Sequence, residues 1–231
     1  MKYVFLPWTF LFLHQAMGQS PIADSIVRQT SITYAINQYH DFMGTRARLY
    51  NGAKFTFYDP SILGHAFFET DSLRKGSVLF DGVWYQHVPM KYDIIADKLV
   101  IANIYGNFLC PVPELTEQFL VGGHTFVHTA KGYYDVLCSG AIEIRVKRSK
   151  QVEEYSSVLE FTRTATEADR YYMVKDGVYH FLLNARSLLA LMGDKRAAVR
   201  QNLRRTKISL RKKNKEQAIV KAAEYYNQLS R

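Results

Sequence analysis

Histidines on a predicted strand are the first residues whose type and spacing could support chemistry. His124 and His128 lie four residues apart in HTFVH. On a helix this spacing would let two imidazoles share a metal ion, but the segment follows Gly122-Gly123 and reads as a strand. Four strand steps separate the two side chains by about 13 Å, which is too far for one ion. We therefore expect hydrogen-bonded histidines and no metal site.

Two aspartates inside apolar strands are the next candidates. Asp93 in KYDII and Asp135 in YYDVL each place a carboxyl where it needs a partner or a shifted pKa. They predict either acid/base chemistry or, more simply, structural hydrogen bonding. The chain contains no G-x-S-x-G, P-loop, G-x-G-x-x-G or H-E-x-x-H motif. No catalytic residue is therefore assigned, and we expect no cofactor.

Adjacent aromatic pairs on predicted strands suggest a ligand-binding surface. Because neighbours on a strand point to opposite faces, both faces of the sheet should carry aromatic rings. One face makes the core, and the other is covered by helices, curled into a barrel interior, or used to bind acyl chains or sugar rings. The candidate ligand-facing aromatics are Trp84, Tyr85, Tyr133, Tyr134, Tyr171 and Tyr172.

The positive charge is confined to the C-terminal part of the chain. Residues 186–231 contain 13 Lys+Arg and 3 Asp+Glu, a net charge of +10, whereas residues 1–185 carry −1. This segment is either a solvated helical face or a contact for an anionic surface. No aromatic residues are interleaved within 195–215, so we expect no nucleic-acid partner. The candidate contact residues are Arg200, Arg204, Arg205, Lys207, Arg211, Lys212, Lys213 and Lys215.

The first 18 residues have the pattern of a cleaved secretory signal. Lys2 precedes an apolar run from Tyr3 to Leu13, and small residues flank Met17 in Ala16-Met17-Gly18. We therefore expect a periplasmic or extracellular protein without a transmembrane span in the mature chain. In an oxidising compartment Cys110 and Cys138 could form a disulfide, or both could remain unpaired thiols.

Turn signals organise the middle of the chain into an antiparallel sheet. Asp81-Gly82, Gly122-Gly123, Ser139-Gly140 and Asp176-Gly177, together with a turn at Asp97, each separate two short runs of β-forming residues. No helical spacers intervene, which disfavours a parallel sheet. The polar stretch 151–169 is either a long loop or an edge excursion.

We predict an α+β fold, mainly an antiparallel β meander that could form a half-barrel. Residues 1–18 are the signal peptide, 19–183 hold an N-terminal helix (to about residue 43) and the sheet, and 184–231 form a basic helical segment packed on it. Asn184 or Ser187 should open a first C-terminal helix, Asp194 should cap a second, and Asn214 with Gln217 a third. The third helix should bury Ile219, Ala222, Ala223, Tyr226 and Leu229.

Composition excludes several classes of protein. Of the 231 residues, 48% are hydrophobic and 14% aromatic, which is too apolar for a disordered chain. Two cysteines are too few for a disulfide scaffold, and there are no repeated apolar runs of about 20 residues typical of a polytopic membrane protein. A globular protein with its own core remains.

The chain also resembles a family of secreted bacterial proteins without an assigned activity. The resemblance lies in RLYNGAKF, GHAFF, KGSVLFDGVWYQHVPMKYD, DKLVI, GGHTFVHT, GYYDVL, RVKRSK and the tail that begins RSLLALMGDKRAAVRQNLRR. It covers nearly the whole mature chain and implies export and a β-rich body with a basic helical C-terminus. It implies no catalytic residues.

Together these observations predict an exported envelope protein with a non-enzymatic role. It would bind, carry or scaffold an apolar or amphiphilic ligand or a protein partner, so its partners would be an envelope lipid, glycan or protein. Two alternatives remain open: a glycan-directed hydrolase that uses two carboxylates, and an anionic-surface binder that acts through the C-terminal basic helices. The sequence leaves the oligomeric state open.

Overall fold

The computed structural model describes residues 31, 47–156, 161–208 and 215–231. The chain divides into two units, Met1–Tyr39 and His40–Arg231. Of the first unit only Ser31 is described, and it is helical. The predicted signal peptide and the rest of the predicted N-terminal helix therefore lie outside the described residues. The strands and the C-terminal helices all belong to the second unit.

A large sheet of eleven strands dominates the second unit. Every neighbouring pair in it is antiparallel, and the sheet is not closed. In spatial order its strands are β1 (Ala53–Lys54), β6 (Phe108–Cys110), β5 (Lys98–Ala102), β4 (Val83–Asp93), β3 (Arg74–Phe80), β7 (Thr116–Val121), β8 (His124–Thr129), β9 (Gly132–Cys138), β10 (Glu143–Lys147), β13 (Arg170–Lys175) and β14 (Val178–Leu182). The prediction of a β-rich, antiparallel fold is confirmed.

The five turn signals all join antiparallel neighbours, as predicted. In the turns Asp81-Gly82 and Asp176-Gly177 both residues have positive φ, between 51° and 77°. Two positive φ values are what a two-residue type I′ hairpin requires, and Asp followed by Gly tolerates them best. Local sequence therefore specifies the hairpins β3–β4 and β13–β14.

The polar stretch after β10 forms a second, smaller sheet. β11 (Lys150–Ser156) pairs antiparallel with β12 (Phe161–Glu167), and β12 pairs parallel with β2 (Ile62–Leu63). Most residues of β11 are exposed, which explains why the alternation of apolar and polar residues is weak there. Of the two predicted alternatives, the strand excursion is the one observed.

Three helices follow the sheet within the described residues: α2 (Ala185–Leu191), α3 (Arg196–Arg205) and α4 (Lys215–Gln228). Asn184 caps α2 through a reciprocal pair of hydrogen bonds with Ser187, as the sequence suggested. The predicted cap at Asp194 is wrong, because a 3₁₀ turn, η4 (Gly193–Lys195), comes first and places Lys195 at the N-cap. Asn214 lies outside the described residues.

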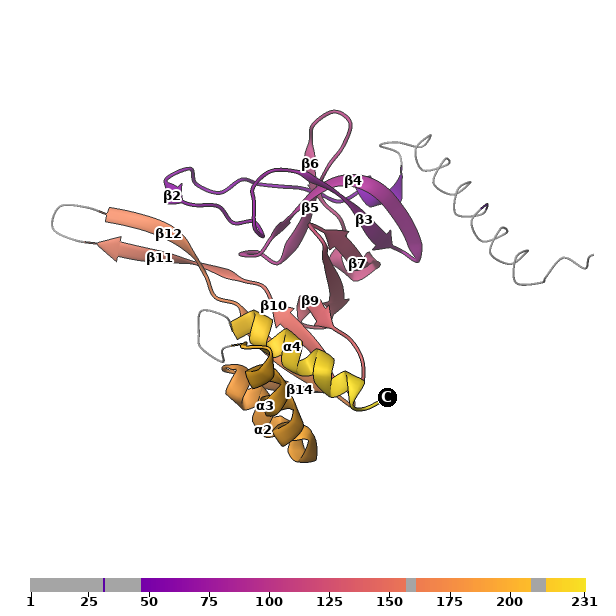
Figure 1. Cartoon of the computed structure of the whole chain (residues 1–231). Helices are drawn as coiled ribbons and strands as arrows, with labels where there is room; N and C mark the ends of the chain where they lie inside the picture. The colour runs from indigo at the N-terminus through magenta and orange to yellow at the C-terminus, as the bar shows by residue number, and fades with distance from the viewer. Residues whose placement is uncertain (1–30, 32–46, 157–160, 209–214) are drawn as a thin grey trace, which may run out of the picture. The chain divides into compact units, whose positions relative to one another are not determined.

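The helices cover one face of the strands β9, β10, β13 and β14 (Figure 1). Ile219, Ala222 and Ala223 of α4 are fully buried there, whereas Leu229 is 42% exposed, so its predicted burial is wrong. None of the described helices is long and apolar enough to cross a membrane. The buried residues of this helix core are Ile142, Ile144, Val146, Tyr171, Met173, Leu182, Ala185, Leu188, Leu189, Met192, Val199, Leu203, Ala218, Ile219, Ala222, Ala223 and Tyr226.

A second core lies within the sheet and is filled by aromatic rings. Phe119 packs against Tyr92, Phe126 and Tyr133 with ring centroids 4.8–5.2 Å apart. All four side chains are buried, and such centroid distances are those of rings in direct contact. The interior of this part of the sheet is therefore occupied by the protein's own side chains.

Candidate functional site

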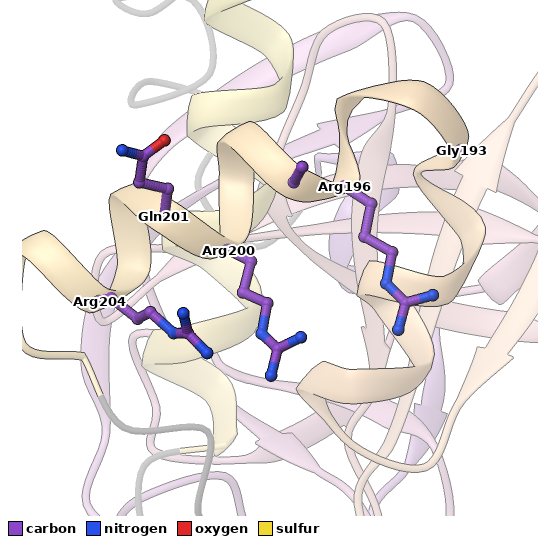
Figure 2. Close-up of a pocket in the computed structure, with 6 residues that line it drawn as sticks. Gly193, Arg196, Arg200, Gln201 and Arg204 are labelled. Atoms are coloured by element: carbon purple, nitrogen blue, oxygen red, sulfur yellow. The ribbon is translucent and has the colours of Figure 1, made fainter.

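Helix α3 presents a row of arginines, which we call the arginine face: Arg196, Arg200 and Arg204. All three are exposed, and Figure 2 shows their side chains extending from the same side of the helix. A spacing of four residues repeats about every helical turn, so the three Cα atoms span about 12 Å along one side. The adjoining side of α3 buries Val199 and Leu203, which fixes the direction of the arginines.

The arginine face borders an open cavity of about 620 Å³. Its lining residues are Gly193, Arg196, Ala197, Arg200, Gln201 and Arg204. No ion pair joins any of the three arginines to a carboxylate in the part of the chain that the structure describes. Unpaired guanidinium groups on one helix face can form bidentate hydrogen bonds with phosphate oxygens.

The other predicted basic residues are only partly gathered at this face. Arg205 and Lys207 are exposed at the end of α3. Lys215 lies elsewhere, with its Nζ 4.2 Å from the ring centroid of Tyr171. The residues 211–213 lie outside the described part of the chain. Sequence reasoning missed Arg196, although its spacing from Arg200 was the signal that could have found it.

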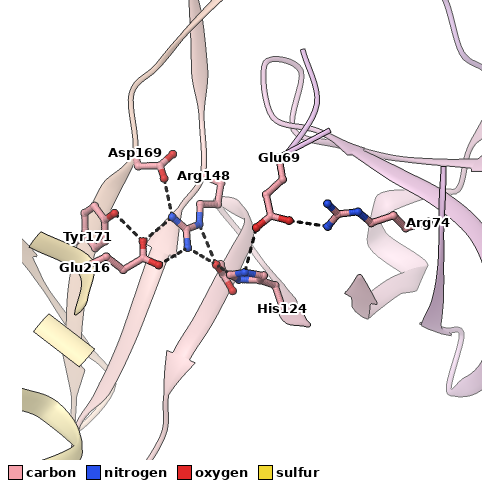
Figure 3. A network of polar contacts seen from close by, with 8 residues as sticks. Glu69, Arg74, His124, Arg148, Asp169, Tyr171 and Glu216 are labelled. Carbon is pink, nitrogen blue, oxygen red and sulfur yellow. Dashed lines mark hydrogen bonds and ion pairs between the residues drawn. The ribbon is translucent and has the colours of Figure 1, made fainter. Parts of the chain in front are cut away.

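A second polar site surrounds the buried side chain of Arg148, between β9, the start of β13 and α4 (Figure 3). The guanidinium donates to the Asp135 carboxylate at 2.7 and 2.9 Å, to Asp169 at 2.7 Å and to Glu216 at 2.7 and 3.2 Å. Tyr171 donates its hydroxyl to Glu216 at 2.8 Å. We call these five residues the Arg148 network. It ties the first turn of α4 to the sheet.

Charges in the Arg148 network stabilise one another's ionised forms. Burial alone would lower the pKa of Arg148, but the hydrogen bonds and charges of Glu216, Asp135 and Asp169 raise it. Burial would raise the pKa of Glu216, but Arg148 and the Tyr171 hydroxyl lower it below its ordinary value. Arg148 and Glu216 therefore each favour the ionised form of the other.

His124 extends the network towards β3. Its Nδ1 lies 2.8 Å from the buried Asp135 carboxylate, and its Nε2 lies 3.6 Å from Glu69, which also pairs with Arg74. The hydrogen bond to Asp135 raises the pKa of His124, against the opposing effect of burial. Asp135 was expected to need a partner, and Arg148 and His124 are its partners.

A cavity of about 220 Å³ lies beside the Arg148 network. It is lined by Phe68, Glu69, Ile94, His124, Arg148, Glu167, Asp169 and Glu216. A glycosidase needs one carboxyl whose pKa is raised so that it can donate a proton. The pKa of Glu216 is lowered instead, and the Asp169 carboxylate accepts a hydrogen bond from Arg148. This geometry favours a structural role for these two carboxylates.

The predicted ligand-facing aromatics fall on both faces of the sheet. Tyr85, Tyr133 and Tyr171 are buried in the cores, and Trp84 is half-buried. Tyr134, which is also buried, and the half-buried Tyr172 lie on the face opposite the helices, where their ring centroids are 5.8 Å apart. The rings of Tyr179 and Phe181, which the sequence reasoning did not single out, continue this outer row along β14.

The remaining sequence candidates have structural partners. Asp93 is buried and accepts hydrogen bonds from the backbone of Ile95 and Ala96 and from the Tyr58 hydroxyl. Cys110 and Cys138 are free thiols that pack against different hydrophobic clusters. Among the described residues there is no group of three or more His, Cys, Asp or Glu side chains that could hold a metal ion.

Comparison with known proteins adds no assignment. No family model matches the chain, and neither a curated protein nor a solved structure is significantly similar to it. A function has therefore to be inferred from the arrangement of its side chains.

Proposed function

We propose that the chain is an exported, non-enzymatic binding protein that attaches to the phosphate headgroups of anionic lipids through the arginine face of α3. The observation that carries the proposal is the row formed by Arg196, Arg200 and Arg204, exposed and without a carboxylate partner among the described residues. Guanidinium groups bind phosphate with two parallel hydrogen bonds, which lysine cannot do.

The distribution of charge supports a surface as the partner. Residues 186–231 carry a net charge of +10, whereas the rest of the chain carries −1. An anionic lipid surface would therefore attract the helical segment and leave the β-rich body facing solvent. For an exported protein, phosphate-bearing lipids are the abundant anionic surface of the envelope.

The carrier version of the binding hypothesis has less support. Aromatic side chains fill the sheet core, and half or more of the residues that line the cavities beside the arginine face and the Arg148 network are charged. These two cavities therefore lack the apolar lining with which lipid carriers bind an acyl chain. Binding to the headgroups needs only the outer face of α3.

Vesicle sedimentation tests the proposal. The full chain is mixed with phosphatidylcholine vesicles that contain about one-third phosphatidylglycerol, and with pure phosphatidylcholine vesicles as the neutral reference. We expect binding to the anionic vesicles alone, weakening steeply as salt rises. A basic residue at such a surface contributes about a fivefold gain in affinity, so replacing Arg196, Arg200 and Arg204 by glutamine should weaken binding about 100-fold.

The matched control removes the same charge from exposed positions on the sheet and its β8–β9 turn, by replacing Lys75, Lys98 and Lys131 with glutamine. This variant should bind the anionic vesicles within about fivefold of the unaltered chain, because only the longer-range attraction is reduced. Inorganic phosphate at matched ionic strength should not displace the protein if the partner is a surface. Equal binding by the two triple variants would refute the proposal.

A further inference from the structure

Strand β14 forms an open edge of the large sheet. It lies last in the strand order and is hydrogen-bonded to β13 alone among the described strands. The opposite edge strand, β1, has only two residues, and one of them is Lys54. Short strands and charged side chains are the usual means by which edges avoid pairing with other chains. One edge of this sheet is therefore protected in this way, and the other is five residues long.

The hairpin geometry determines which backbone groups of β14 point outward. Lys175 and Val178 flank the two-residue turn, so they form a hydrogen-bonded pair. From there along the ladder, non-hydrogen-bonded and hydrogen-bonded pairs alternate. His180 and Leu182 therefore direct their N–H and C=O groups to β13. The N–H and C=O groups of Tyr179 and Phe181 point away from the sheet, and no described segment pairs with them.

The side chains of β14 lack the features that discourage pairing. The strand VYHFL contains no proline and no Lys, Arg, Asp or Glu. Tyr179 is 38% exposed and Phe181 50%, and Leu183 just beyond the strand is 69% exposed. Because α2–α4 cover the other face, these rings gain no burial from the chain's own helices. The free backbone edge and the exposed apolar side chains thus coincide.

We propose that β14 pairs antiparallel with β14 of a second copy of this chain, with a twofold axis at His180. In this register Tyr179 faces Phe181 of the second copy, and the outward backbone groups of both residues find partners in two symmetric pairs. The strand is thus complementary to itself. The aromatic row that runs from Tyr134 through Tyr172 to β14 then continues into the second copy.

Charge on the outer face does not oppose this pairing. Arg145 is paired with Glu143 at 2.7 Å and also donates to the Tyr179 hydroxyl at 2.6 Å. Lys147 on the same face is paired with Asp97. These two charges on the outer face are therefore compensated within each copy. A dimer would present two arginine faces, which would raise lipid affinity by avidity, but the pairing does not depend on lipid binding.

Sedimentation velocity over a concentration series tests the pairing with the full chain. A five-residue ladder buries less than the roughly 1,600 Å² of a standard interface, so we expect dissociation at about 10 µM. Replacing Phe181 by proline removes an outward N–H and should weaken the dimer at least about tenfold. Replacing Tyr179 by lysine should do the same if the proline variant fails to fold. The control is Ile104→Lys, at a residue 78% exposed and outside β14, which should leave the dimer unchanged.

A disulfide experiment tests the register. At the twofold axis the two Cα atoms of residue 180 would be about 4.5 Å apart, within bridging range. In a background with Cys110 and Cys138 replaced by serine, His180→Cys should form a symmetric intermolecular disulfide, whereas Val178→Cys should not. A monomer at every concentration would overturn the proposal, as would a dimer that persists in both edge variants. A dimer whose Val178→Cys variant bridges faster would overturn the register.

Discussion

Replacing Arg148 by methionine removes five hydrogen bonds to three carboxylates from the site where α4 meets the sheet. Asp169 and Glu216 keep contact with solvent, since their side chains are 17% and 37% exposed. Asp135 has no such contact with solvent, because its side chain is 0% exposed, and its Oδ1 already lacks a hydrogen-bond partner among the described residues. Within this part of the chain, the His124 contact would be the one that remains for its charge.

Loss of one partner of a buried ion pair typically costs about 3–5 kcal/mol, because the other charge remains buried. For a domain of this size such a loss lowers the melting temperature by about 6–20 °C. Circular dichroism during thermal unfolding measures the change directly. The same substitution at Arg48, whose side chain is 67% exposed in its pair with Asp81, should cost less than about 1 kcal/mol.

A second substitution separates the buried charge from lost packing. In Arg148→Met combined with Asp135→Asn, the buried group is neutral and can still bond to His124. The double variant should therefore be more stable than the sum of the two single effects predicts. Additive effects, or an Arg148 variant no less stable than the Arg48 variant, would refute the view that Asp135 depends on Arg148 for its charge.

Two further predictions concern the contacts of α4 and its neighbour His124. The raised pKa of His124 contributes stability that is present below about pH 6.5 and is lost as the pH rises through the folded-state pKa. The lowered pKa of Glu216 contributes stability that is present above about pH 4.5 and is lost as the pH falls through the folded-state pKa. Thermal melts should therefore show a maximum between these values, and His124→Asn should flatten the alkaline side; a maximum above pH 8 would contradict this. Asn227→Leu should lower the free energy of unfolding in urea by about 2–4 kcal/mol, because Asn227 forms hydrogen bonds with both backbone groups of Ile142. Gln228→Leu, at an exposed position of the same helix, should change it little. Equal losses in the two variants would exclude a stabilising role of the Asn227 hydrogen bonds.

Local signals account for what could be predicted of the fold. The Asp-Gly and Gly-Gly pairs specify hairpins because the required positive φ values are a property of two adjacent residues. The cap at Asn184 is equally local, since its partner Ser187 is three residues away. The cap expected at Asp194 was wrong because a 3₁₀ turn, η4, occupies Gly193–Lys195 and delays the start of α3.

The candidate sites were less predictable because their partners are distant in the chain. Asp135 was recognisable as a carboxyl that needs a partner, but nothing near it in the sequence points to Arg148, His124 or Glu216. The aromatic pairs predicted rings on both faces without showing which face the helices cover. The arginine face could have been predicted from the sequence, because Arg196 and Arg200 are four residues apart within the helix that the sequence predicts there.

Helix α4 also has a consequence for the order in which the fold can be completed. Asn227 satisfies Ile142 across 85 residues, and Glu216 satisfies Arg148 across 68. During synthesis the backbone groups of Ile142, just before β10, therefore lack Asn227, and Arg148 has Asp135 and Asp169 but not Glu216, until α4 has left the ribosome. Contacts of such separation form slowly, since the intervening chain must first be ordered. A nascent chain that lacks α4 would expose the apolar helix core and these polar groups together, a state suited to recognition by chaperones or proteases.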